Sequence, residues 1–488
     1  MPEYFIHFAL AHNEFRIPEL LSICELLDVN IELPADPAER DLNRPFMVVK
    51  LENDEAAKKI ASRCILVKAI YALWAHSTTY ASLHEINRAN SHLWMQYQPS
   101  ASFKFVVDSI HHRIPQKRIR ETIQSFSYMA WKGPIDMKNP EVVLTCLEEY
   151  SGPDPSAKRS EHDGEFIHLY FGRLLSEEGA TRHLVTKFDV KQRVFYGNTS
   201  MDAEVSLLMA NQAQAAPGKL VYDPFAGTGS MLYTAAHFGA FVVGSDLDGR
   251  QMRGKNATSS GTLRAATQYG VAHRLVDSLT FDVTRNPWRC GELFDAIVTD
   301  PPYGVRAGAK RLGGKKKNGE LREEPIVLED GQLAHTKPTY VPPTKPYELS
   351  DLAQDLVHFA AYMLKPGGRL VFFLPTVTDE YQDVDIPRAE GMELVANSLQ
   401  DFGKWGRRLI TMVKTADKPV DPPRFLGAED APSEGGIKSD TVPAHKNFRV
   451  KYFQGFQTGG SDSVSGAEDN KPATGDGGAS TTTSTTNP

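Results

Sequence analysis

Residues 220–304 contain two short apolar segments, each of which runs directly into a loop of unusual composition. The first segment, Leu-Val-Tyr-Asp, is followed by Pro-Phe-Ala-Gly-Thr-Gly at positions 224–229. The second, residues 295–299, is followed by Asp-Pro-Pro-Tyr at positions 300–303. Short apolar runs bounded by turn residues are typical of strands buried in a parallel sheet. Because open α/β sheets bind ligands at the carboxyl ends of their strands, we predict a doubly wound α/β domain with its site at these loops.

The first loop is glycine-rich and leads into a helix-compatible segment. Gly227 and Gly229 permit backbone angles and a close ligand approach that a β-carbon would forbid, and a helix over residues 230–238 would turn its free N–H groups toward the loop. A dinucleotide fingerprint has a third glycine where this chain has Leu232, which weakens a pyrophosphate interpretation. The next apolar run ends at Asp246, and an acid there suits a ribose diol.

A third acid, Asp282, lies near the end of a further strand that we predict over residues 275–281. It is placed to accept a hydrogen bond from an adenine amino group. An ordinary acid in a surface loop is an equal alternative.

The second loop has a specific chemical logic. The lone pair of an exocyclic amine on a base is delocalised into the ring, so the amine is a poor nucleophile. The Asp300 carboxylate and the Pro301 carbonyl can accept its two N–H bonds, which localises the lone pair and aims it at an electrophile. Prolines fix the turn and lack N–H donors, and Tyr303 can stack on the base. The alternative is a proline-rich turn with a buried tyrosine.

With these loops, the string Gly-Asn-Thr-Ser-Met-Asp-Ala-Glu at positions 197–204 carries a resemblance. Residues 198–415 resemble a class I, Rossmann-like, S-adenosylmethionine-dependent amino-methyltransferase. The fuller pattern is similar to the archaeal and eukaryotic tRNA guanosine-10 N2-methyltransferases. The resemblance implies S-adenosylmethionine as cofactor, tRNA as substrate and a heterodimer with a small zinc-binding activator subunit. The cofactor-binding residues expected on these grounds are Asp223, Phe225, Gly227, Gly229, Asp246 and Asp282.

The N-terminal half has a different pattern of short strands and helices. Residues 1–60 predict a small α+β, ferredoxin-like subdomain. Residues 61–175 resemble a THUMP RNA-binding domain, most clearly in the turn Asp-Met-Lys-Asn-Pro at 136–140. A charge run is usually only a solvated face, but a catalytic domain acting on a large substrate must position it. The candidates for phosphate contacts are Lys104, Arg113, Lys117, Arg118, Arg120 and Lys132.

Length and composition set the remaining limits. A chain of 488 residues is too long for one core, and we place a connector at residues 176–197, so that a chain beginning near Arg193 should still bind the cofactor. The net charge of −7 means that any RNA site must be a local basic patch. The four cysteines have no metal-ligand spacing and fit a reducing compartment. No signal or membrane-spanning run is visible, so a cytoplasmic location is expected.

Two segments depart from a compact pattern. The polar insertion at residues 306–346 predicts a long loop, and we interpret it as a flap that touches RNA phosphates, with a solvated insertion as the alternative. Residues 416–488 form a tail that is of low complexity from 458. We also expect the strand over residues 275–281 to lie at a sheet edge and to receive the activator.

Three other functions remain open. Asp-Pro-Pro-Tyr would equally serve an amino-methyltransferase acting on DNA adenine or protein glutamine. A non-catalytic RNA-binding scaffold would tolerate loss of Gly227, Gly229 or Asp300, all of which are intact. A nicotinamide dehydrogenase fits poorly with Leu232 and with the prolines.

Overall fold

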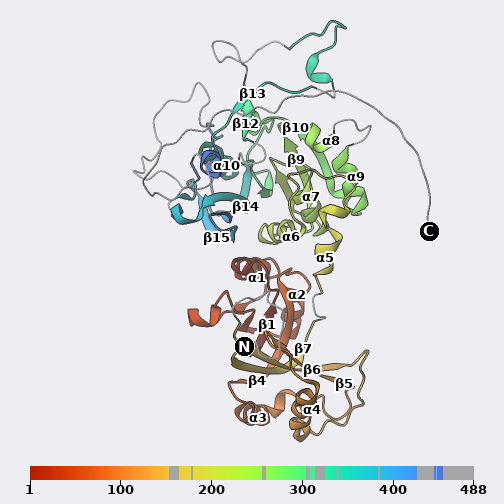
Figure 1. Cartoon of the computed structure of the whole chain (residues 1–488). Coiled ribbons are helices and arrows are strands. Elements are labelled where there is room, and N and C mark those ends of the chain that lie inside the picture. Colours follow the sequence, from red (N-terminus) through yellow and green to blue (C-terminus); the bar gives the residue numbers. More distant parts are fainter. Residues whose placement is uncertain are drawn as a thin grey trace, which may run out of the picture.

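The computed structural model describes residues 1–152, 164–176, 180–254, 260–303, 308–313, 325–337, 340–382, 385–425, 445–446 and 448–453. Within them lie two seven-stranded sheets and a two-stranded hairpin. The two large sheets belong to an N-terminal and a C-terminal unit that lie end to end (Figure 1). The predicted α/β class of the C-terminal unit and the α+β character of the N-terminal unit are confirmed.

The C-terminal sheet has the strand order β10-β9-β8-β11-β14-β16-β15. Its strands are β8 (Leu220–Asp223), β9 (Phe241–Asp246), β10 (Leu275–Thr280), β11 (Phe294–Thr299), β14 (Leu364–Val377), β15 (Met392–Asp401) and β16 (Trp405–Lys414). The pairs from β10 to β14 are parallel, whereas β16 is antiparallel to both neighbours. The chain first builds the sheet outward from β8 through β9 to β10, then returns to add β11 on the other side of β8. The order of the strands therefore reverses between β8 and β11, and open α/β sheets bind ligands at the carboxyl ends of their strands at such a point.

Helices cover this sheet on both faces and form two separate cores. One core contains side chains of α6 (Ala203–Gln212), α7 (Ser230–His237) and α9 (Gly261–Gln268). The other contains α10 (Leu349–Met363). The short helices α5 (His183–Lys187) and α8 (Arg250–Arg253) complete this unit as far as residue 425. The apolar residues of α6 are buried in the first of these cores.

The N-terminal sheet has the strand order β2-β3-β1-β4-β7-β6-β5. Its strands are β1 (Glu3–Phe8), β2 (Ile31–Glu32), β3 (Phe46–Leu51), β4 (Val67–Ser77), β5 (Phe103–Ile110), β6 (Val142–Tyr150) and β7 (Phe166–Leu174). Its helices are α1 (Arg16–Leu26), α2 (Asp54–Ala61), α3 (Tyr80–Ala89) and α4 (Gln116–Ser125). One continuous sheet spans the boundary that we placed at residue 60, although α1 and α2 pack in one core and α3 in another. The division into two subdomains stays a proposal.

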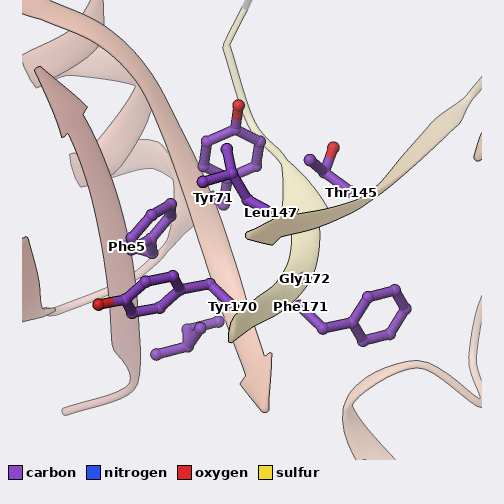
Figure 2. A pocket seen from close by; sticks show the side chains of 8 residues that line it. Phe5, Tyr71, Thr145, Leu147, Tyr170, Phe171 and Gly172 are labelled. Atoms are coloured by element: carbon purple, nitrogen blue, oxygen red, sulfur yellow. The ribbon is translucent and has the colours of Figure 1, made fainter. Parts of the chain in front are cut away.

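A further aromatic cluster joins the two parts of this sheet. Phe5, Tyr71 and Tyr170 come together from β1, β4 and β7, whereas Phe171 points to the opposite side (Figure 2). The rings of Phe5 and Tyr170 stack with their centroids 4.1 Å apart. Because Phe5 is only 2% exposed, these rings form part of the core that makes the sheet one body.

The two units share a hydrophobic core. Phe15, Ile65 and Leu66 of the N-terminal unit belong to the same buried cluster as α6 and α7. The Glu19 carboxylate of α1 accepts a hydrogen bond from Asn211 Nδ2 of α6 at 2.6 Å. This arrangement argues against our expectation that a chain beginning near Arg193 would keep the cofactor site, because such a chain would expose one side of α6.

The polar insertion contains more structure than its composition predicts. The insertion includes the antiparallel hairpin of β12 (Lys310–Leu312) and β13 (Thr344–Pro346), so the expectation of a structureless loop is wrong for these residues. The lysines at 315–317 lie outside the described residues, as does the tail from 458. A short helix, α11 (Phe448–Phe453), docks on the C-terminal unit. Among the described helices, none combines the length and the apolar character needed to cross a bilayer.

Candidate active site

The last residues of β8 and β11 are joined directly by a buried hydrogen bond. Asp223, at the end of β8, is 1% exposed. Its Oδ1 accepts hydrogen bonds from the Thr299 hydroxyl at 2.6 Å and from the Phe225 N–H at 3.0 Å. Its Oδ2 has no partner among the described residues. Desolvation raises the pKa of Asp223 to about 7, and its buried Oδ2, at the carboxyl end of β8, is left for a ligand.

The glycine loop needs its glycines for two different reasons. Gly229 has a φ of 87° and precedes α7, and a β-carbon there would lie 2.7 Å from the Tyr233 hydroxyl. Gly227 has a φ of 51°, and the nearest atom to a β-carbon would be Phe225 O at 3.9 Å. The space beside Gly227 is therefore open, as a ligand-facing backbone requires.

Asp246 fixes the same loop from the end of β9. Its Oδ2 accepts a hydrogen bond from Gly227 N at 3.0 Å, and its Oδ1 accepts one from Asp248 N at 2.8 Å. Desolvation raises the pKa of Asp246 to about 6. A carboxylate offers about four lone-pair sites, so each oxygen of this half-buried group keeps acceptor capacity for a ligand.

Asp282 follows β10 and is only 3% exposed, which excludes the alternative of a surface-loop acid. Its Oδ1 accepts hydrogen bonds from the backbone N and the hydroxyl of Thr284, each at 2.8 Å. Its Oδ2 accepts one from Leu312 N of the insertion hairpin at 2.5 Å. Tyr347 and Ala309, beside the hairpin, also pack on Phe225. The insertion thus contacts the predicted cofactor loops, which its sequence did not indicate.

The second loop brings Asp300, Pro301 and Tyr303 together at the end of β11. Asp300 follows β11, Pro301 is buried, and the hydroxyl of the half-buried Tyr303 donates to the Asp300 carboxylate. Desolvation raises the pKa of Asp300 to about 6, against the opposing effect of Arg407. The Tyr303 ring borders a cluster that includes Phe448 of α11.

Arg407 is a member of this site that sequence reasoning missed. It comes from β16, more than a hundred positions after the loop, and its Nη1 lies 3.7 Å from Asp300 Oδ2. The same nitrogen donates to the Tyr303 hydroxyl at 3.3 Å. No local motif surrounds Arg407, so only the pairing of β16 with β14 reveals its place.

The candidate phosphate contacts lie elsewhere. Four of them are exposed on or near β5 and α4: Arg113, Lys117, Arg120 and Lys132. Lys104 on β5 is half-buried. Arg118 already has partners, since it pairs with the buried Glu148 at 2.6 Å. Figure 1 places α4 and β5 at the end of the N-terminal unit farthest from the C-terminal sheet.

Comparison with known proteins gives matches to both units. Residues 2–180 match the family described as the Tmrp11 THUMP N-terminal domain, and residues 191–315 match the RMKL-like methyltransferase domain.

Several curated proteins match along nearly their whole length. The tRNA (guanine(10)-N(2))-methyltransferase of Saccharomyces cerevisiae is 37% identical, over 93% of this chain and 100% of the relative. The protein of the same name from Schizosaccharomyces pombe is 35% identical, over 93% of this chain and 96% of the relative. The tRNA (guanine(10)-N(2))-methyltransferase TRMT11 of Homo sapiens is 33% identical, over 93% and 95% of the two chains. Among solved structures, TrmN from Thermus thermophilus matches at 17% identity and a TM-score of 0.40, over 84% of this chain and 99% of that one, a likeness too low to carry an argument.

Proposed function

The chain belongs to the tRNA (guanine(10)-N(2))-methyltransferase family. We therefore propose that it methylates the exocyclic N2 amine of guanosine 10 in tRNA, with S-adenosylmethionine as methyl donor. The observation that carries this proposal is the hydrogen bond from Thr299 to Asp223. It joins the ends of the two strands that lead into the glycine loop and the Asp-Pro-Pro-Tyr loop, where the sheet reverses its order. An amine acceptor and a methyl donor bound there would be neighbours.

The residues of the first loop fit an adenosine-bearing cofactor. Gly227 leaves its side of the loop open, and Asp223 Oδ2 is a buried acceptor without a partner among the described residues. Asp246 would accept hydrogen bonds from the ribose diol, and Asp282 would accept one from the adenine amino group. S-adenosylmethionine supplies an electrophilic methyl group when bound.

The second loop provides the acceptors for the amine. Asp300 would accept one N–H of the guanine N2 amine, and the Pro301 carbonyl would accept the other. Tyr303 would stack on the base. Since the Tyr303 hydroxyl already donates to Asp300, the carboxylate is oriented before the base arrives, which is the condition for catalysis by positioning.

The N-terminal unit would hold the tRNA. Phosphate contacts set the register of a nucleic acid without reading its sequence, and the exposed residues Arg113, Lys117, Arg120 and Lys132 suit that role. Lys104 is a weaker candidate because it is half-buried. Arg118 would reach a phosphate only while keeping its pair with Glu148.

We also propose the small zinc-binding activator as a partner and the cytoplasm as the compartment. The supporting observation for the partner is that β10 is an edge strand, as expected, with Val276 60% exposed. An unpaired apolar edge favours association with another strand. Val276→Asp should abolish co-purification with the activator while cofactor binding persists. Leu394→Asp, a matched change on the opposite edge strand β15, where Leu394 is 50% exposed, should leave the complex intact. If Val276→Asp still forms the complex, β10 is not the interface.

The proposed activity is tested by incubating the protein and its activator with labelled S-adenosylmethionine and unmodified tRNA. Nucleoside digestion should yield N2-methylguanosine, and a tRNA with adenosine at position 10 should receive no label. Asp300→Asn should remove the activity but keep cofactor binding. Label found only on DNA adenine or on glutamine peptides would reject the proposal and favour the alternative acceptors.

A further inference from the structure

Arg407 joins the antiparallel end of the sheet to the loop that would hold the amine. It lies opposite Pro375 of β14 and Gln400 of β15, and its Nη1 reaches both Asp300 and Tyr303. We propose that Arg407 is a positioning residue for methyl transfer, which holds the Asp300 carboxylate ionised and correctly turned through a direct ion pair and a relay across the Tyr303 hydroxyl. The inference rests on the proposed function, since it concerns how that reaction is supported.

The guanidinium of Arg407 has further contacts besides those with the loop after β11. Its Nε donates to Gln400 Oε1 at 2.7 Å, and its Nη2 lies 3.5 Å from Met201 Sδ. Its central carbon lies 4.1 Å from the centroid of the Phe373 ring. The side chain is only 14% exposed. A planar guanidinium held in this way loses little further freedom in contacting Asp300.

Two hydrogen bonds in series connect Arg407 to Asp300 through the Tyr303 hydroxyl. Arg407 donates to the Tyr303 oxygen at 3.3 Å, and Tyr303 in turn donates to one oxygen of Asp300. The other oxygen, Oδ2, faces Arg407 directly at 3.7 Å. Hydrogen bonds in such a chain polarise one another. Asp300 and Tyr303, two of the residues that would touch the base, are thus held by one side chain.

The competing explanation is that Arg407 has only a structural role. The neighbouring residue Arg408 is an arginine whose contacts fit such a role. Arg408 donates to Asn397 Oδ1 at 3.4 Å, and its central carbon lies 3.5 Å from the centroid of the Tyr381 ring. These contacts stay within the last two strands and the segment after β14. Arg407 also contacts the loop after β11, through Asp300 and Tyr303, so the two adjacent arginines should affect the reaction differently.

The reaction requires an ionised Asp300, and Arg407 favours that charge state. A carboxylate only accepts hydrogen bonds, whereas a protonated carboxyl would present an O–H donor to an amine that also donates. The methyl transfer also leaves the amine nitrogen with one proton more than the product requires, and an ionised Asp300 is placed to accept it. Burial disfavours that ionised form, while Arg407 and the hydrogen bond from Tyr303 favour it. Without Arg407, the pKa of Asp300 should rise above about 6.

The test compares Arg407→Gln, Arg407→Lys and Arg408→Gln in the full-length protein with its activator, using unmodified tRNA and labelled S-adenosylmethionine. Arg407→Gln should lower kcat at neutral pH about 10- to 100-fold, with KM for tRNA and cofactor affinity unchanged. The acid limb of its pH–kcat profile should move to higher pH, so that the loss shrinks in alkaline buffer. Arg407→Lys should restore the position of the acid limb, because it restores the charge, and Arg408→Gln should match the wild type.

Each outcome separates the inference from the proposed function. Methylation of guanosine 10 by the wild type tests the function, and the ratio of variant to wild type tests Arg407. A normal kcat in Arg407→Gln would overturn the inference while leaving the function intact. So would a loss that is equal at all pH values and accompanied by a lowered melting temperature, because that pattern marks a structural pair. Should Arg407→Gln fail to fold, the pH profile of Arg407→Lys decides. An acid limb and a kcat equal to those of the wild type would show that a positive charge at this position is sufficient, as the inference requires. An acid limb shifted to higher pH would contradict the role assigned to that charge.

Discussion

Phe15→Ala is expected to destabilise the C-terminal unit, although Phe15 lies before the first helix of the N-terminal unit. Its side chain is 0% exposed and belongs to the core formed by α6 and α7. The preceding residue, Glu14, accepts a hydrogen bond from the Ser398 hydroxyl at 3.0 Å through its backbone carbonyl. Removing the ring would therefore leave a cavity between the units, beside helices that support the glycine loop.

The size of the effect follows from the burial of the side chain. Truncating a fully buried phenylalanine costs about 3–5 kcal/mol. In a unit of 150–250 residues, each kcal/mol shifts the melting temperature by roughly 2–4 °C. A fall of about 6–20 °C is expected if the C-terminal unit unfolds as one cooperative unit of that size. Phe171→Ala is the matched control, because Phe171 is also 0% exposed but packs with α3.

Hydrogen exchange read by mass spectrometry separates the two variants. In Phe15→Ala, amides of α6 should exchange faster, and cofactor should restore part of their protection. In Phe171→Ala, exchange should rise around β6 and β7 and change less in α6. If Phe15→Ala folds with unchanged exchange in α6 and an unchanged melting temperature, the core is not shared in the way the contacts indicate.

Three further predictions concern the site and its surroundings. Asp246→Asn should weaken cofactor binding about tenfold or more by calorimetry, since it removes a charged acceptor. Burial raises the pKa of Asp246 to about 6, so the affinity of the wild type for the cofactor should fall as the pH drops through 6 and the carboxylate becomes protonated. The affinity of the variant should not change over the same pH range. Phe448→Ala should lower kcat by loosening the cluster beside Tyr303, since Phe448 is 1% exposed, while Val450→Ala, at a position 52% exposed, should leave kcat unchanged. Lys117→Glu combined with Arg120→Glu should raise KM for tRNA and flatten its salt dependence without altering cofactor affinity; an unchanged salt dependence would place the phosphates elsewhere.

Local sequence patterns predicted most of the elements around the site. The apolar runs that end at Asp223 and Asp246 are strands, and the glycine-rich segment between them begins a helix. These features depend on neighbours in the chain, so periodicity and turn residues reveal them. The edge position of β10 was also predicted.

The features that were missed depend on contacts between distant residues. Arg407 lies in a strand whose polar residues have no motif, and its role appears only when β16 pairs with β14. The insertion hairpin has a polar composition, yet Leu312 donates its backbone N–H to Asp282, a bond that depends on no side chain at that position. The roles of the catalytic, cofactor and phosphate residues themselves stay predictions.

The connector makes hydrogen bonds to both units, and this bears on how the enzyme would select its target nucleotide. We expected residues 176–197 to separate two independent units, but Thr181 donates to the Cys64 carbonyl at 2.7 Å, and Arg193 donates to the Ser230 hydroxyl at 2.8 Å. Together with the shared core, these bonds fix the distance between α4 and the loop after β11. Phosphate contacts carry no sequence information of their own. Held at a fixed distance from Asp300, they would nevertheless select a nucleotide by its position along the RNA, which a flexible connector between the two units would not allow.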